Sequence, residues 1–266
     1  PLQSITNRPM NKSLSLSIVM PALDEEANIF VAISDTLQAF DNFNINGEII
    51  VVNDGSKDKT PEIIEEICKK DQRVKMISHI TPQGIGASFW DGVDHSTKEA
   101  VSMLPGDGEN DPNEIIRYLN LLSHVDMVVP FVFNPQVRPW WRSALSFVYR
   151  FIINTTFLVN FNYTNGTILY RKSVLEELSD RNQSFFFQTD ILIRSVKRGY
   201  LFAEVPYCLG MRGAGDSKAV SYPSLKKVIK GYLRLLRDFY FSKEWNSDQP
   251  FAKNTSTAQR HKTSQK

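Results

Sequence analysis

Cysteine and histidine are too few and too scattered in this 266-residue chain to build a metal centre. The two cysteines, Cys68 and Cys208, lie 140 positions apart, and the four histidines form no cluster. The thiolate and imidazole ligands of a zinc site normally occur at short, regular spacings. We therefore expect no zinc site and no disulfide scaffold, but two reduced, buried cysteines in a cytosolic chain.

Long hydrophobic runs are also missing. No stretch reaches 18 apolar residues, and the nearest approach, residues 143–161, is interrupted by Arg150, Asn154 and Thr155. A membrane-spanning helix needs about 20 predominantly apolar residues. The first twelve residues, PLQSITNRPMNK, lack the apolar core of a secretory signal. The sequence thus predicts a cytoplasmic protein with no transmembrane helix in this chain.

A strong overall charge is absent, because the net charge is only +2. Residues 218–266 nevertheless carry eleven Lys or Arg against three Asp or Glu, a net of +8 that leaves −6 on the rest of the chain. This asymmetry favours an anionic partner such as a membrane surface or a phosphate, with a solvated basic helix and tail as the alternative. Aromatic residues do not alternate with these cations as in a nucleic-acid module, so we expect no nucleic-acid partner.

Short apolar runs alternate with segments of helical periodicity through the first half of the chain. Strands are predicted at residues 14–20, 47–53, 74–79, 99–104 and 125–133. Helices are predicted between them, at residues 24–40, 60–70, 85–96 and 112–123. This alternation predicts an α/β fold with a mostly parallel sheet flanked by helices on both faces. Because ligands of such sheets bind beyond the carboxyl ends of the strands, functional residues should directly follow strands.

Polar and glycine-rich segments do follow the first four strands: PALDEEANI, NDGSKDKT, QGIGASFWDG and LPGDGENDP. In the first segment, Glu25 and Glu26 also suit the first turn of a helix, where the helix dipole favours acids. In the second, Asn53 and Asp54 can hydrogen bond to a base or a ribose. The glycines of the third segment open a helix without forming a P-loop.

The fourth segment brings three carboxylates, Asp107, Glu109 and Asp111, to the end of a strand. Hard oxygen ligands of this kind hold Mg²⁺ or Mn²⁺. Pro105 stands where a paired-aspartate metal site would have its first acid. Asp111, directly before Pro112, suits the cap of the following helix instead.

In their order and spacing, the four segments resemble the nucleotide-sugar-binding half of glycosyltransferase family 2, a family of inverting enzymes with the GT-A fold. Further along, the segments RSALS, TNGTILYRKSVLEEL, FFFQTDILIRSVKRGYLFAEVPY and MRGAGDSK look like dolichyl-phosphate mannose synthases and the related bacterial polyprenyl-phosphate glycosyltransferases. The similarity runs from about Leu16 to about Phe241.

The resemblance implies one GT-A domain over residues 14–241. Its nucleotide-sugar-binding half would cover residues 14–133 and its acceptor half residues 134–241. Residues 1–13 would be an N-terminal extension. The polar residues 242–266 are expected to be a disordered tail.

The resemblance also implies roles on the donor side. Asp107, which is expected to be catalytic, and Glu109 would hold Mg²⁺ or Mn²⁺. Because Mg²⁺ often needs only one or two carboxylates besides phosphates, Pro105 does not abolish such a site. A UDP- or GDP-sugar is expected to contact Pro21, Ala22, Leu23, Asp24, Glu25, Asn53, Asp54, Gln83, Gly84, Gly106 and Asp107.

On the acceptor side the resemblance implies a polyprenyl phosphate, whose ionised oxygen needs cationic positioning more than a strong base. Its phosphate is expected to contact Arg142, Ser146, Arg212, Ser217 and Lys218, and Arg142 is also expected to be catalytic. Asp190 is the third catalytic candidate, either as the base for a hydroxyl acceptor or as a residue that orients the donor sugar. An acid at a helix N-terminus is its structural alternative.

Residues 222–241, YPSLKKVIKGYLRLLRDFYF, have the pattern of a basic amphipathic helix. Such a helix suits an anionic bilayer interface, and packing on the domain is the competing interpretation. The sequence therefore predicts a peripheral position at the cytoplasmic membrane face, reached directly or through a membrane-anchoring partner protein.

The resulting hypothesis is a metal-assisted inverting glycosyltransferase that moves a sugar from a nucleotide donor to a polyprenyl phosphate. One alternative is a family 2 transferase acting on a saccharide hydroxyl in cell-surface polysaccharide synthesis. The other is a GT-A protein that binds nucleotide sugar or lipid phosphate with impaired turnover, which Pro105 and Asn53 favour.

Overall fold

The computed structural model describes residues 14–134, 140–208, 222–241 and 250–264. Within these ranges, the strands are β1 (Leu16–Ala22), β2 (Gly47–Asn53), β3 (Val74–Ser78), β4 (Ala100–Met103), β5 (Met127–Val132), β6 (Leu169–Arg171) and β7 (Phe202–Tyr207). The helices are α1 (Ile29–Asn42), α2 (Thr60–Lys70), α3 (Ile85–His95), α4 (Pro112–Ile116), the 3₁₀ helix η1 (Leu119–Ser123), α5 (Trp140–Phe157), α6 (Lys172–Glu176), α7 (Phe187–Arg198), α8 (Tyr222–Phe241) and α9 (Ser256–Ser264).

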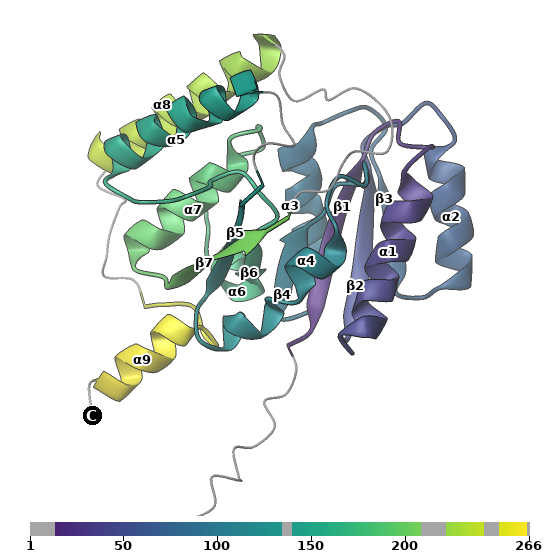
Figure 1. Cartoon of the computed structure of the whole chain (residues 1–266), viewed down its shortest axis with the longest axis horizontal. Coiled ribbons are helices and arrows are strands. Elements are labelled where there is room, and N and C mark those ends of the chain that lie inside the picture. Colours follow the sequence, from purple (N-terminus) through teal and green to yellow (C-terminus); the bar gives the residue numbers. More distant parts are fainter. Residues whose placement is uncertain (1–13, 135–139, 209–221, 242–249, 265–266) are drawn as a thin grey trace, which may run out of the picture.

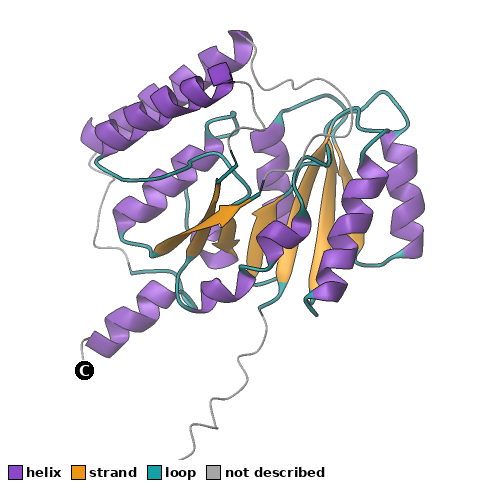
Figure 2. Cartoon of the chain, viewed as in Figure 1, coloured by secondary structure: helices purple, strands orange, loops and turns teal. Residues whose placement is uncertain are grey.

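The seven strands form one sheet in the order β3-β2-β1-β4-β6-β5-β7. Strand β6 pairs antiparallel with β4 and with β5, whereas the other neighbouring strands are parallel. Helices cover both faces of the sheet (Figures 1 and 2). The predicted α/β class with a mostly parallel sheet is therefore confirmed.

Alternate residues of the central strands enter two hydrophobic clusters, one on each face of the sheet. Val19 of β1 packs in a cluster with Phe89 of α3, whereas its neighbour Ile18 packs in a second cluster with Ile33 of α1. Successive side chains of a strand point to opposite faces, so a strand covered on both sides must be apolar at nearly every position. This is why β1 and β2 read as continuous apolar runs.

The element bounds agree closely with the prediction in some places and differ in others. Strand β2 and helix α2 span residues 47–53 and 60–70 as predicted. The helix predicted at residues 112–123 is instead divided into α4 and η1. Strand β6 was not predicted, because a strand of three residues is too short to show an alternating pattern.

The C-terminal segment differs from the prediction of a disordered tail. Residues 250–264 are packed against the domain and end in α9. Ala252, Thr255 and Thr257 are buried, and the Phe251 ring lies 5.3 Å from that of Tyr200, centroid to centroid. The polar composition of this segment does not indicate these contacts, because they are made with residues far away in the sequence. The rest of the predicted tail lies outside the described residues.

None of the helices in the described ranges is both long enough and apolar enough to cross a membrane. The two cysteines are free, as predicted. Cys68 is partly buried, whereas Cys208 is exposed. The prediction that both cysteines are core residues was therefore wrong for Cys208.

Candidate active site

The chain order of the strands creates a topological switch point between β1 and β4. From β1 the chain continues to β2 and β3 on one side, and β4 then pairs with the other side of β1. Beyond β4, the chain stays beside β1, because the Gly106 N–H donates to the Pro21 carbonyl oxygen over 2.9 Å. Doubly wound sheets bind ligands in the crevice beyond the carboxyl ends of the strands at such a point. Pro21 and Ala22 end β1, Leu23 and Asp24 follow it, and Gly106 and Asp107 follow β4.

The loop after β1 is fixed to the loop after β2 by reciprocal hydrogen bonds. The backbone N–H of Asp24 donates to Ser56 Oγ over 3.0 Å, and Asp24 Oδ1 accepts the N–H of Lys57 over 2.8 Å. Asp24 has a φ of 55°, a left-handed conformation that Asp tolerates better than most residues. These contacts preorganise the edge of the sheet on which a donor would bind.

The prediction that Glu25 and Glu26 lie in the first turn of a helix was wrong. Helix α1 begins at Ile29, and its first turn contains no acid. The backbone N–H of Glu25 donates to Thr60 Oγ1 over 2.8 Å, and that of Glu26 donates to Asp58 Oδ2 over 3.0 Å. The two residues therefore join two strand-end loops instead of interacting with the dipole of α1.

Asp54, the first residue after β2, is only 5% exposed. Its Oδ1 accepts the N–H of Gln83 over 2.7 Å, and its Oδ2 accepts the N–H of Gly84 over 2.8 Å. Gly84 precedes α3 with a φ of 99°, a conformation that a side chain would strain. Three residues predicted to bind the nucleotide are thus in direct contact, and Asp54 holds the start of α3 at the sheet edge.

His79, the first residue after β3, completes this cluster and was missed in the sequence. Its Nδ1 lies 2.7 Å from Asp54 Oδ1, and its Nε2 lies 2.9 Å from Asp91 Oδ2 on α3. His79 is the last residue of the strand predicted at residues 74–79, and this strand-end position was the signal that could have identified it.

Asn53, the last residue of β2, is also 5% exposed and lies beside the same cluster. Its Oδ1 accepts the N–H of Ser56 over 3.1 Å, and its Nδ2 donates to Ser78 Oγ over 3.4 Å. Asn53 thus stabilises the turn between β2 and α2.

The acidic turn after β4 contains Asp107 and Glu109, both half-buried. The Glu109 N–H donates to Asp107 Oδ1 over 3.1 Å, so the two residues lie close together. Asp111 caps α4 by accepting the Asn113 N–H over 2.9 Å, which confirms the role predicted for it.

The described residues hold no group of three or more His, Cys, Asp or Glu that could bind a metal by themselves. Two carboxylates in this turn fit Mg²⁺ or Mn²⁺ only in an arrangement where phosphate oxygens supply further ligands. Asp107 and Glu109, at the switch point, have the hard oxygen atoms that this arrangement needs.

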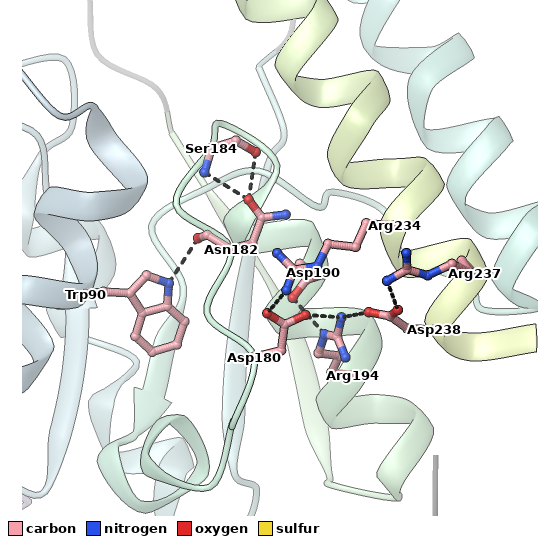
Figure 3. Close-up of polar contacts among 9 residues, drawn as sticks. All are labelled: Trp90, Asp180, Asn182, Ser184, Asp190, Arg194, Arg234, Arg237 and Asp238. Atoms are coloured by element: carbon pink, nitrogen blue, oxygen red, sulfur yellow. Dashed lines mark hydrogen bonds and ion pairs between the residues drawn. The ribbon is translucent and has the colours of Figure 1, made fainter. Parts of the chain in front are cut away.

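Asp190 lies in the first turn of α7, 2% exposed, inside an ionic network drawn in Figure 3. Its Oδ2 accepts from Arg194 Nε over 2.8 Å, and Arg194 also pairs with Asp180 and with Asp238 of α8. Burial raises the pKa of Asp190, and the nearby Arg194 offsets only part of this rise, so that the resulting pKa is about 6. In this arrangement Asp190 fastens α7 to α8 through Arg194.

Residues 180–184 connect this network to α3 (Figure 3). Trp90 Nε1 of α3 donates to the carbonyl oxygen of Asn182 over 3.0 Å. A Cβ added at Gly86 would lie 2.4 Å from the carbonyl carbon of Gln183, so only glycine permits this approach. On the other side, Asp180 pairs with Arg234 of α8. The segment thus links the C-terminal amphipathic helix to the helix that begins at the Asp54 cluster.

Most residues predicted to bind the acceptor phosphate lie outside the part of the chain that the structure describes. Arg212, Ser217 and Lys218 belong to the range 209–221, and the side chain of Arg142 is likewise not described. Ser146 is half-buried on α5. The acceptor contacts therefore remain predictions.

Helices α5 and α8 lie side by side (Figure 1), with the Phe157 and Tyr232 rings 6.1 Å apart. On α8, Val228, Leu235 and Leu236 pack in or against the core cluster. The two helices also carry exposed apolar side chains, which we call the α5–α8 face: Leu145, Val148, Phe151, Ile152, Ile229 and Leu233. Helix α8 therefore packs on the domain with one side and leaves both apolar and basic residues exposed on the other.

Known proteins resemble this chain in sequence and in fold. The family model described as Glycosyl transferase family 2 matches residues 17–179. Polyprenol monophosphomannose synthase of Mycolicibacterium smegmatis is 28% identical over 229 residues, which cover 80% of this chain and 83% of the relative. Undecaprenyl-phosphate 4-deoxy-4-formamido-L-arabinose transferase of Edwardsiella ictaluri is 26% identical over 205 residues, covering 76% of this chain but only 62% of the relative's length.

Among solved structures, glucosyl-3-phosphoglycerate synthase from Mycobacterium tuberculosis, in complex with Mn²⁺, UDP and phosphoglyceric acid, has a TM-score of 0.63 at 18% identity. That match covers 84% of this chain and 78% of the other. The same synthase with Mn²⁺ and UDP-glucose has a TM-score of 0.62 at 18% identity, covering 85% and 78%. These likenesses show a shared fold, and the family match extends over more than half of the chain. The chain belongs to glycosyl transferase family 2.

Proposed function

We propose that this protein transfers a sugar, with inversion, from a nucleoside diphosphate donor to a polyprenyl phosphate. The observation that carries the proposal is the convergence of the predicted donor residues at one sheet edge. Asp54, Gln83 and Gly84 are in contact there, and Gly106 is hydrogen bonded to Pro21 beside Asp107. Family membership and the polyprenol monophosphomannose synthase relative support the same assignment.

The strand order suggests how the donor lies along this edge. Because the carboxylates Asp107 and Glu109 follow β4, we propose that the diphosphate binds at the β1–β4 switch point. The nucleoside then extends toward the ends of β2 and β3, where Asn53, Asp54 and Gly84 lie. A bound Mg²⁺ or Mn²⁺ would neutralise the charge that develops on the leaving diphosphate.

In the transfer step, a phosphate oxygen of the lipid attacks the anomeric carbon from the side opposite the diphosphate. A new carbon–oxygen bond forms, the bond to the diphosphate breaks, and its electron pair leaves with the nucleoside diphosphate. A phosphate monoester is mostly ionised at neutral pH, so no proton has to be removed. Arg142, Arg212 and Lys218 are proposed to hold that phosphate, and Ser146 and Ser217 to complete its hydrogen bonds.

Asp190 bears on the choice between acceptors. A saccharide hydroxyl would need a general base within reach. Asp190, the predicted base, is buried and paired with Arg194. This pairing favours the lipid phosphate as the acceptor, and the role proposed for Asp190 is to hold Arg194 where it joins α7 to α8.

The α5–α8 face supports a position at the cytoplasmic membrane surface. Exposed Ile229 and Leu233 alternate with exposed Lys226, Lys230 and Arg234 on α8. Apolar side chains flanked by cations are typical of helices that lie in an anionic bilayer interface. A membrane-anchoring partner protein is the alternative occupant of this face.

Nucleotide binding measured by calorimetry tests the proposal first, with UDP, GDP, CDP and TDP, each with and without Mn²⁺. Metal-dependent binding of one nucleotide is expected. Product analysis by mass spectrometry then compares a polyprenyl phosphate with saccharide acceptors. Transfer only to a saccharide would mean that the acceptor is a saccharide and not a lipid phosphate. Nucleotide binding without any transfer would indicate a binding protein with impaired turnover.

A further inference from the structure

His79 lies at the centre of a buried polar cluster on the nucleoside side of the proposed donor site. Its backbone N–H donates to the carbonyl oxygen of Asn53 over 2.9 Å, which extends the pairing of β2 and β3 by one residue. The side chain of His79 is 6% exposed, and each ring nitrogen faces a carboxylate. The ring therefore spans from the end of β2, at Asp54, to the second turn of α3, at Asp91.

Three donors converge on the carboxylate of Asp54. Two are the backbone N–H groups of Gln83 and Gly84, and the third is the ring of His79. A buried carboxylate is costly unless several hydrogen bonds replace its water. Without His79, the carboxylate would keep two donors and lose the one that comes from a side chain.

The same cluster closes the loop formed by residues 79–84. His79 begins the loop, Gln83 and Gly84 end it, and all three are bonded to Asp54. A Cβ added at Gly55 would lie 3.0 Å from Pro82, so the turn after β2 also contacts this loop. Residues 80–83 are exposed, with Ile80 at 99%. The hydrogen bonds to Asp54 thus fix both ends of this loop. Its exposed residues 80–83 lie beside the position proposed for the nucleoside.

Asp91 orients the histidine from the opposite side. Its side chain is 42% exposed, and its carboxylate accepts from His79 Nε2 when that nitrogen is protonated. The ring of His79 is thus held between two carboxylates, one at each ring nitrogen.

We infer that His79 is a positioning residue of the donor site, acting through Asp54 to hold the 79–84 loop against the nucleoside end of a nucleotide sugar. The inference rests on the proposed function and extends it to a residue that does not itself contact the donor. Loss of a residue with this role weakens donor binding in the ground state and the transition state alike. Such a change raises the donor KM and leaves kcat nearly unchanged.

Three substitutions of His79 separate its two contacts. His79→Asn places an amide donor near the position of Nδ1 and can keep the contact to Asp54. His79→Gln places its amide near the position of Nε2 and can keep only the contact to Asp91. His79→Leu removes both contacts. His124→Asn, at an exposed histidine between η1 and β5, is the matched control.

The experiment measures the affinity for whichever of UDP, GDP, CDP and TDP the wild type binds best with Mn²⁺, together with donor KM, kcat and thermal unfolding. We expect His79→Leu and His79→Gln to lose donor affinity by about tenfold with kcat within about threefold of wild type. His79→Asn should recover most of the lost affinity, and the control should match the wild type.

Two outcomes would overturn the inference while the proposed function stands. One is unchanged donor affinity in a folded His79→Leu variant whose melting temperature alone is lowered. The other is an equal loss of donor affinity in the Asn and Gln variants, which would mean that His79 does not act through its contact to Asp54. If His79→Leu does not fold, the comparison of Asn with Gln decides. A wild type that binds no nucleoside diphosphate would instead refute the proposed function, and with it the inference.

Discussion

Asp107 is the residue on which the metal dependence of the proposed reaction rests. Its side chain is half-buried, and its Oδ1 accepts a backbone hydrogen bond from the nearby Glu109. We expect Asp107→Asn to abolish the Mn²⁺-dependent part of nucleotide binding and to lower kcat by at least about a hundredfold, because a charged ligand of the metal is lost. Calorimetry and product formation measure the two effects.

The neighbouring Asp111 offers a matched control for this prediction. Asp111→Asn keeps a good helix cap, because Asn and Asp are similarly favoured at this position. This variant should therefore keep both activity and stability. Turnover at the wild-type level in Asp107→Asn would remove Asp107 from the mechanism.

Glu48 illustrates a buried acid at the opposite end of the sheet, where it contributes to stability and not to the site. It is 3% exposed and accepts hydrogen bonds from Ser17, Lys75 and Thr97. Burial alone would raise the pKa of Glu48, but these hydrogen bonds outweigh burial and lower it to about 2. Its folded-state pKa therefore lies below the ordinary value of 4.5.

Because the pKa is depressed on folding, the contribution of Glu48 is present above about pH 4.5 and is lost as the pH falls toward 2. It amounts to about 3 kcal/mol at neutral pH. We expect Glu48→Gln to lower the free energy of unfolding at pH 7 and to lose less stability than wild type between pH 4.5 and 2.5. Urea unfolding at these pH values measures both curves, and parallel curves would contradict the assignment.

The sequence predicted single residues well where one local rule applied. Asp111 could be recognised as a cap because Pro112 follows it, and a cap depends only on its neighbours. The bonds from Asp54 to residues 83–84, and from His79 to Asp91, join separate elements. The strand-end position of Asp54 indicated a functional residue. No pattern in the sequence specifies that its carboxylate accepts hydrogen bonds from the backbone of residues 83–84 and so holds that loop.

At the scale of elements, amphipathic periodicity predicted that α8 is a helix but not which side faces the domain. Val228, Tyr232 and Leu236 pack against the core, whereas Ile229 and Leu233 are exposed. The reason is that α8 is apolar on more than one side. Packing on the domain therefore describes one side of the helix, and the exposed side still has the pattern expected at a bilayer interface. Strand β6 could not be predicted for a different reason, since its pairing depends on β4 and β5 and not on its own three residues.

The exposed part of α8 gives a direct test of membrane attachment. We expect the double substitution Ile229→Ser and Leu233→Ser to weaken binding to anionic vesicles by about tenfold or more, because two apolar side chains no longer enter the interface. Both residues are already exposed, so the melting temperature should not change. Vesicle co-sedimentation measures the effect.

Phe30→Ser on α1 is the control, since Phe30 is equally exposed on a different helix. Vesicle binding that survives the double substitution would exclude this part of the α5–α8 face as the attachment surface. Equal weakening by Phe30→Ser would indicate a nonspecific effect of lost apolar surface.

Over the whole molecule, the C-terminal segment closes the domain at the side remote from the proposed active site. Asp126, 0% exposed, directly precedes β5 and accepts the N–H groups of Leu201, Ser256 and Thr257 and the hydroxyl of Thr257. One buried carboxylate thus joins β5, β7 and the start of α9. The amino end of β5 lies at the opposite edge of the sheet from the carboxyl ends that form the proposed site.

This separation predicts that stability and donor binding respond differently to loss of the segment. Removing residues 250–266 exposes Tyr200 and leaves the buried Asp126 with fewer donors, which should cost about 3 kcal/mol and lower the melting temperature by about 5–10 °C. Nucleotide affinity, measured well below the new melting temperature, should stay within about twofold of the full chain. Asp126→Asn keeps one acceptor oxygen and should show a smaller loss of the same kind. Reduced affinity in the folded truncated protein would show instead that this distant segment supports the geometry of the donor edge.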